Sequence, residues 1–132
     1  MDIDLGAALG AEGESSTQRL VLYIPNKDKN GHELKDHQRW VREARELLSQ
    51  IGGGSTTFPP ADGTWIDENG KILWELTRMV FCFIFPDQFR ARVSSLREFL
   101  HRFGRETNQG EVVVEVEDEF YRIRNFDPPG GS

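Results

Sequence analysis

The chain has 132 residues, with 16 Lys and Arg against 22 Asp and Glu, which gives a net charge of -6. This length suits one domain with an ordinary core. The acidic balance argues against general attraction to nucleic acid or to an anionic membrane. The longest wholly apolar run, residues 79–85, is too short to span a bilayer as a helix, and residues 1–17 lack the regions of a secretory signal. We therefore expect a cytoplasmic protein without a membrane segment.

The first predicted element is a strand at residues 19–24. Because side chains alternate across a strand, Leu20 and Leu22 share one face while Val21 and Tyr23 share the other. Both faces of this strand are thus apolar.

A helix is predicted next, because apolar residues from Trp40 to Ile51 recur at spacings of three and four. Asp36 is its expected N-cap and Gly52 its left-handed stop. Residues 52–62, GGGSTTFPPAD, read as irregular, since two prolines bar a central strand.

A hairpin follows, with its turn at Asn69 and Gly70, a step that suits positive φ values. It places Trp65 on a strand antiparallel to a long strand over residues 72–85. At the end of this long strand Phe81 and Cys82 point to opposite faces and both have apolar neighbours. As the lone cysteine, Cys82 is expected to be a buried small hydrophobe.

Helical spacing returns at residues 86–103, with Gly104 as the expected C-cap, and residues 111–116 and 119–123 read as a terminal hairpin. The order predicts an α+β, ferredoxin-like split βαβ fold, with two helices on one face of a four- or five-stranded antiparallel sheet. The single domain is expected at residues 18–126, between disordered tails at residues 1–17 and 127–132.

Several short motifs also resemble a family of small bacterial domains of unknown function. The helix with Trp40, the GGGST turn, the segment GTWIDENGKILWE and the helix end RFGRET carry this resemblance, which covers residues 19–123. Members of the family pair a Gly-Trp-x-Asp-x-x-Gly hairpin with an aromatic-Gly-Gln-Glu-Ser type signature, where this chain has Arg105 in place of the Gln. The resemblance implies the fold, and it implies no activity.

Helices on one face leave the second face of the sheet uncovered, although three strands are apolar on both sides. This pattern favours a non-catalytic protein-interaction or self-association domain that forms a homodimer or binds a protein partner. The expected interface residues are Tyr23, Phe81, Phe83 and Val113.

An alternative is a cofactor-free enzyme or small-ligand binder of the dimeric α+β barrel type, in which two sheets enclose a pocket. Trp65 would line a cleft beside the glycine-rich loop, whose Thr56 and Thr57 are further ligand-binding candidates. His37 and Glu75 are weak catalytic candidates, and His37 qualifies only if the first helix begins at the mouth of a pocket.

Other chemistry finds little support in the sequence. The glycines of residues 52–54 follow a helix and lack a P-loop lysine, and the three histidines are not joined by a cysteine or carboxylate cluster, so no cofactor and no metal are expected. Nucleic-acid binding through the arginines of the second helix is a third alternative, made unlikely by the absence of basic residues among the strand aromatics.

Overall fold

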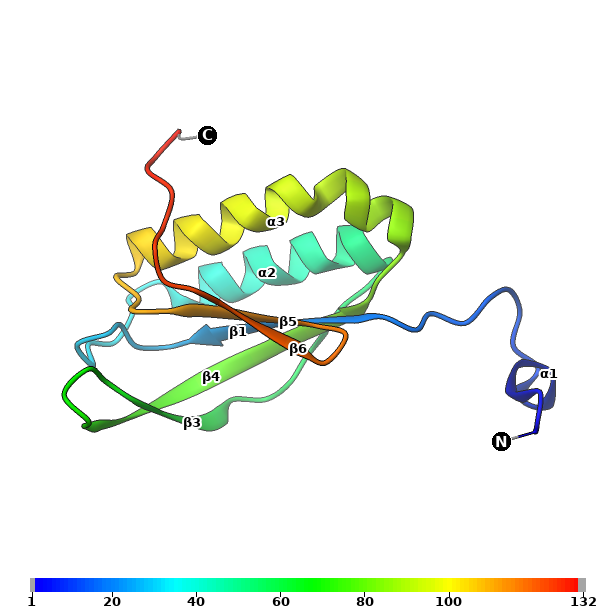
Figure 1. Ribbon diagram of the computed structural model, residues 1–132, viewed down its shortest axis with the longest axis horizontal. Helices are drawn as coiled ribbons and strands as arrows, with labels where there is room; N and C mark the ends of the chain where they lie inside the picture. The colour runs from blue at the N-terminus through cyan, green and yellow to red at the C-terminus, as the bar shows by residue number, and fades with distance from the viewer. Residues whose placement is uncertain (1, 131–132) are drawn as a thin grey trace.

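The computed structural model describes residues 2–130 as an α+β arrangement with an antiparallel six-stranded sheet. The helices are α1 (Leu5–Leu9), α2 (His37–Gly52) and α3 (Pro86–Glu106), and the strands are β1 (Arg19–Pro25), β2 (Thr56–Thr57), β3 (Ala61–Ile66), β4 (Ile72–Phe83), β5 (Val112–Val116) and β6 (Glu119–Ile123). Figure 1 shows α2 and α3 side by side on one face of the sheet, with nothing over the other face.

The strand order is β2-β4-β1-β5-β6, and β3 pairs with the free end of β4. In the register, Leu22 of β1 lies opposite Val80 of β4 on one side and Val114 of β5 on the other. The twelve residues of β4 pair with three different strands. As a result, the β3–β4 hairpin projects beyond the helices at one end of the sheet (Figure 1).

The core lies between the helices and the face of the sheet that they cover. Leu20, Leu22, Val80 and Leu48 are fully buried there, together with Trp40. These strand residues alternate with the side chains that face away from the helices, as the period of two requires. The helices therefore cover the face of the sheet that carries Leu22 and Val80.

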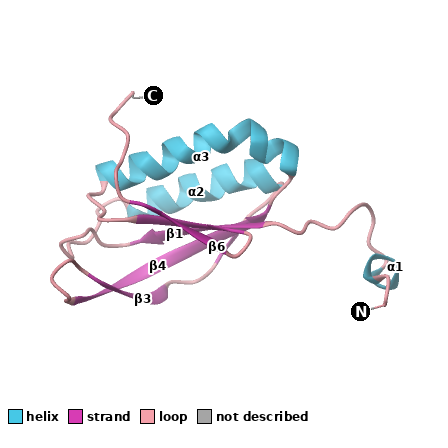
Figure 2. Ribbon diagram, viewed as in Figure 1, coloured by secondary structure: helices cyan, strands magenta, loops and turns pink. Residues whose placement is uncertain are grey.

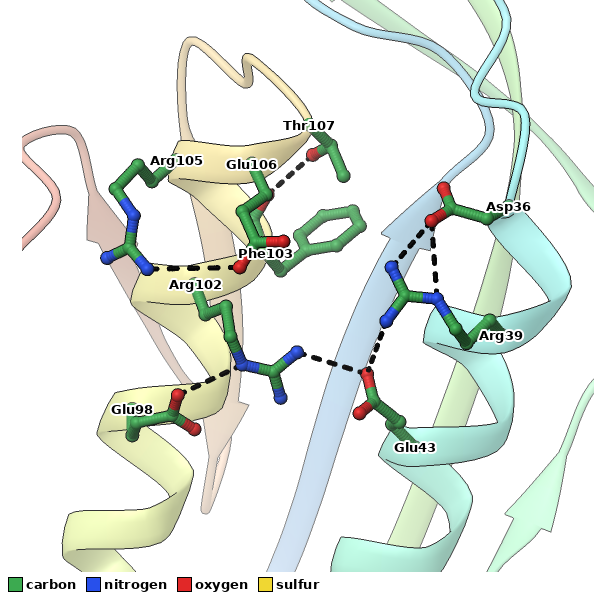
Figure 3. A network of polar contacts seen from close by, with 9 residues as sticks. All are labelled: Asp36, Arg39, Glu43, Glu98, Arg102, Phe103, Arg105, Glu106 and Thr107. Atoms are coloured by element: carbon green, nitrogen blue, oxygen red, sulfur yellow. Dashed lines mark hydrogen bonds and ion pairs between the residues drawn. The ribbon is translucent and has the colours of Figure 1, made fainter. Parts of the chain in front are cut away.

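Charged residues tie the two helices together above this core. Arg102 of α3 contacts Glu43 of α2 at 3.2 Å, while Arg39 contacts Asp36 on α2 itself (Figure 3). Both guanidinium groups lie over the ring of Trp40, at 4.7 Å for Arg39 and 4.9 Å for Arg102. The network thus seals the core where α2 begins.

Cys82 lies in this core, and burial raises the pKa of its thiol to about 11. We expect the native protein to resist a thiol-specific reagent at pH 8 and to react fully in denaturant, because the thiolate is the reactive form. Absorbance of the released thiolate dye measures both rates. A fast reaction of the folded protein would show that this thiol is accessible.

Both helices extend past their expected stops. Gly52 is the last residue of α2 and Gly53 takes the left-handed conformation, with a φ of 78°. Similarly, α3 continues through Gly104 to Glu106. Gly104 makes room for a neighbouring side chain instead of ending the helix, since a Cβ there would lie 2.3 Å from the ring of Phe126.

The segment after β6 passes across α3 near the C-terminal end of that helix (Figure 2). Asp127, the first residue of the expected C-terminal tail, is held by Arg97 at 2.9 and 3.0 Å, and its carbonyl accepts from Arg105. Its backbone N–H donates to Nδ1 of His101 at 2.8 Å. At the other end, Figure 1 shows α1 at the far end of an extended segment, and none of its residues is buried.

The hydrogen bond from Arg97 holds the pKa of Asp127 below its usual range. A carboxyl group with a lowered folded pKa stabilises the fold above its unfolded pKa of about 4, and this contribution is lost as the pH falls through the folded value. We therefore expect Asp127→Asn to lower the melting temperature at pH 7. The difference from the unaltered protein should shrink on acidification, and a constant difference across the pH range would contradict this.

Candidate functional site

The face of the sheet that the helices leave uncovered, called the open face below, is rich in aromatic side chains. Phe58 stacks on Phe81 with ring centroids 5.4 Å apart, and Phe83 meets Phe81 edge-on at 6.1 Å. The open face also holds the other residues expected at an interface, Tyr23 and Val113, which alternate with core residues of β1 and β5. Whether they form an interface stays a prediction.

Polar groups lie among these aromatics. The hydroxyl of Tyr23 donates to Glu115 at 2.9 Å. Burial is the main cause that raises the pKa of Tyr23, and the neighbouring Glu115 carboxylate also raises it. Arg19 lies over the ring of Phe81 at 5.9 Å, and Phe120 meets Tyr23 edge-on. The open face thus offers flat apolar surfaces with the Glu115 carboxylate and the Arg19 guanidinium among them.

The β3–β4 hairpin brings Trp65 and Glu75 together. Its turn is closed by Asp67, whose carboxylate accepts from the N–H groups of Asn69 and Lys71 at 2.9 Å. Glu75 lies six residues before Phe81 on β4, and Trp65 lies opposite Leu73, two residues before Glu75. Because side chains alternate along a strand, both Trp65 and Glu75 extend on the same side as the open face.

Glu75 is half-buried in this position. Burial raises the pKa of its carboxyl group, and a hydrogen bond from Trp65 and the charge of Lys27 oppose the rise. The side chain of Glu75 lies across Gly63, so that a Cβ added at residue 63 would lie 3.2 Å from Cγ of Glu75. A partly desolvated carboxyl group beside an indole attracts a cation when it is ionised and can donate a proton when it is protonated.

The structure does not bring Trp65 to the glycine-rich loop. Trp65 pairs with Leu73, whereas Thr56 pairs with Phe81, so the two sites lie roughly 26 Å apart along β4 at about 3.3 Å per residue. The expected cleft between them is wrong. Trp65 instead packs near Gly110, and Thr57 lies in the short edge strand with its hydroxyl buried and unpartnered.

His37 was a catalytic candidate only if its helix begins at the mouth of a pocket, and the structure meets this condition. The helix α2 begins between two surface hollows of about 340 and 290 Å³, and His37 lines both. Its Nε2 lies 2.8 Å from the carbonyl oxygen of Ile24. A carbonyl only accepts, so Nε2 carries the proton and Nδ1 is left as the acceptor of the neutral ring. Glu75 lies on the opposite face of β4, so the two weak catalytic candidates are not brought together.

The smaller hollow contains residues that the sequence analysis did not single out. It lies between α2 and β4 and is lined by His37, Gln38, Val41, Arg42, Arg45 and Arg78. The signal was present in part, because Arg42 and Arg45 are three apart on α2. Nothing local could show that Arg78 of β4 joins them.

Several arginines of α3 form ion pairs with carboxylates, unlike those that line the smaller hollow. Arg90 pairs with Asp87, Arg97 with Asp127, and Arg102 with Glu43 and Glu98. These pairs leave little of the helix charge free for phosphates, which weakens the nucleic-acid alternative.

Within residues 2–130 no three His, Cys, Asp or Glu side chains lie close enough together to hold a metal ion. None of the helices in that range is long and apolar enough to cross a membrane.

Comparisons with known proteins give a fold likeness only. No family model and no curated protein matches the chain. Two similar solved structures are a phage SAM lyase in complex with S-methyl-5'-thioadenosine, with a TM-score of 0.62, and a phage SAM lyase in the apo state, with 0.61. Each is 11% identical, and each match covers 86% of this chain and 94% of that chain.

This likeness corrects the first functional expectation. A non-catalytic interaction domain was expected because no catalytic motif stands out in the sequence, yet a similar fold occurs in an enzyme. The absence of a motif therefore does not indicate the absence of chemistry, and the ligand-binding alternative is the better supported one.

Proposed function

We propose that this chain is a cofactor-free small-ligand-binding protein or enzyme with a ferredoxin-like fold, whose ligand lies against the open face beside Trp65 and Glu75. The observation that carries this proposal is the half-buried Glu75 carboxyl group, which the strand register places diagonally beside Trp65 on one side of the hairpin. The ligand class that fits is a nucleoside with a sulfonium or thioether group, of the kind named with the similar phage enzyme.

The chemistry of such a ligand matches the groups on this face. An adenine ring stacks on aromatic side chains, and β1 provides Tyr23 on this face, opposite Met79 and about 13 Å along β4 from Glu75. The positive sulfur of S-adenosylmethionine is attracted by a carboxylate and by the face of an indole, which Glu75 and Trp65 provide.

A second copy of the chain would complete the site. Neither of the two hollows described above includes Trp65 or Glu75, and both side chains lie on the side of the sheet that the helices leave uncovered. The open face itself exposes large apolar side chains, with Phe83 47% and Phe120 44% exposed. Contact between two open faces would bury the aromatics and form the dimeric α+β barrel.

The test is calorimetric titration with S-adenosylmethionine and with S-methyl-5'-thioadenosine. We expect Glu75→Gln to weaken binding of the sulfonium compound about tenfold or more, because it removes the charge, and to change binding of the uncharged thioether little. Chromatography of the mixture separately detects conversion of one compound into the other.

Glu111→Gln is the matched control, because it removes one half-buried carboxylate that pairs with Arg124 at 2.9 Å and lies outside the hairpin. Its affinity should stay within twofold of the unaltered protein. Absence of binding of both compounds, or equal weakening by the two substitutions, would rule out the proposed ligand class. Light scattering measures whether a second copy of the chain completes the site. A monomer in the presence of saturating ligand would contradict the proposed dimer.

A further inference from the structure

The hollow between α2 and β4 gathers cations that have no carboxylate partner. Within residues 2–130, Arg42, Arg45 and Arg78 make no ion pair, whereas six of the other nine arginines do. In a protein with a net charge of -6, three unpaired guanidinium groups around one hollow create a local positive potential.

Within residues 2–130, the carboxylates of α2 make no ion pair with this cluster, including Glu46, which follows Arg45 directly. Asp36 and Glu43 of α2 face Arg39 and Arg102 and are engaged there (Figure 3). No Asp or Glu is among the residues that line the 290 Å³ hollow. The charge of the cluster is therefore available to an anion from solution.

Two of the groups are held in place by the backbone. Nε of Arg78 donates to the carbonyl of Phe58 at 2.8 Å, which fixes the guanidinium and leaves its terminal nitrogens for a ligand. The bond between His37 Nε2 and the Ile24 carbonyl likewise leaves Nδ1 as an acceptor for a hydroxyl or amide group of the ligand. Groups positioned in this way lose less freedom when a ligand binds.

The neighbouring hollow of about 340 Å³ shares His37 and Gln38 with this one, and it is lined by polar groups. Among them, the side-chain oxygen of Asn26 accepts from the N–H of Leu76 at 3.0 Å, so the NH₂ group remains as a donor. Glu33 and Lys35 also lie there. This second hollow suits an uncharged polar portion of a ligand rather than a second anionic group.

We propose that Arg42, Arg45 and Arg78 bind the phosphate group of a small phosphorylated molecule, whose polar remainder accepts from Asn26 and donates to Nδ1 of His37 in the neighbouring hollow. This site is separate from the open face, because Arg78 extends from the side of β4 that faces α2. It does not depend on the proposed function.

The probe is inorganic pyrophosphate, titrated at constant ionic strength and followed by the amide resonances of the ¹⁵N-labelled protein. Saturable shifts are expected in the first half of α2 and at Arg78. The double variant Arg42→Gln/Arg45→Gln should bind about tenfold more weakly or worse, because charge-assisted hydrogen bonds are lost. A matched double variant, Arg90→Gln/Arg122→Gln, has the same net charge and should bind within twofold of the unaltered protein.

Three results would overturn the proposal: no saturable shift up to about 10 mM pyrophosphate, equal weakening in the two double variants, or shifts reproduced by sodium chloride alone. A single-stranded oligonucleotide is titrated in parallel. Binding of the oligonucleotide through Arg42 and Arg45, without binding of pyrophosphate, would assign the cluster to nucleic acid instead.

Discussion

Val80→Asp is expected to abolish the folded state. Val80 is fully buried, lies opposite Leu22 in the register and packs in the core beneath the helices. An unpaired carboxylate there costs about 5 kcal/mol or more, which is comparable to the whole stability of a small domain. Circular dichroism and thermal unfolding measure the loss directly.

Phe81→Asp is the matched control on the next residue of the same strand. Phe81 is half-buried on the open face, where it contacts Phe58 and Phe83. We expect this variant to remain folded, with a loss of about 1–2 kcal/mol from the removed ring contacts. If the two variants were equally folded, the assignment of the covered and open faces would be wrong.

The contrast between Val80 and Phe81 also explains why so much of the fold was predictable. Alternation in β1 and β4 and the helical spacing around Trp40 are local patterns, and each fixes which side chains share a face. What the patterns could not give was which face the helices cover. That choice depends on the packing of α2 and α3, which no single segment records.

Contacts between distant residues account for the failures. Gly104 was interpreted as a helix stop, whereas it accommodates the ring of Phe126, 22 residues later in the chain. The cleft beside Trp65 failed because β2 pairs with the opposite end of β4 from the hairpin. Both readings were locally sound, and tertiary packing overrode them.

The same limit applies to the candidate sites. Trp65 and Glu75 could be paired from the hairpin turn alone, because two residues on antiparallel strands meet across a known turn. The Arg78 cluster could not, since it joins a helix and a strand through the order of the sheet. Sites formed across elements of different type are those that need the structure.

Gly52→Ala is the second substitution with a large expected effect. Alanine in place of glycine normally stabilises a helix by about 1 kcal/mol. Here a Cβ at residue 52 would lie 2.4 Å from the backbone oxygen of Phe83 and 2.8 Å from Cβ of Cys82. Neither atom belongs to a flexible side chain end, so α2 must move away from β4, and we expect a net loss of about 2–3 kcal/mol.

Gly54→Ala is the control two residues later. Nothing lies within 4 Å of the Cβ that it would add, and its φ is not positive, so stability should change by no more than about 0.5 kcal/mol. Urea unfolding of the two variants measures the difference. A stable Gly52→Ala protein would mean that α2 is not held against β4 as closely as the structure has it, and the hollow lined by Arg45 and Arg78, which depends on that same approach, would lose its geometric basis.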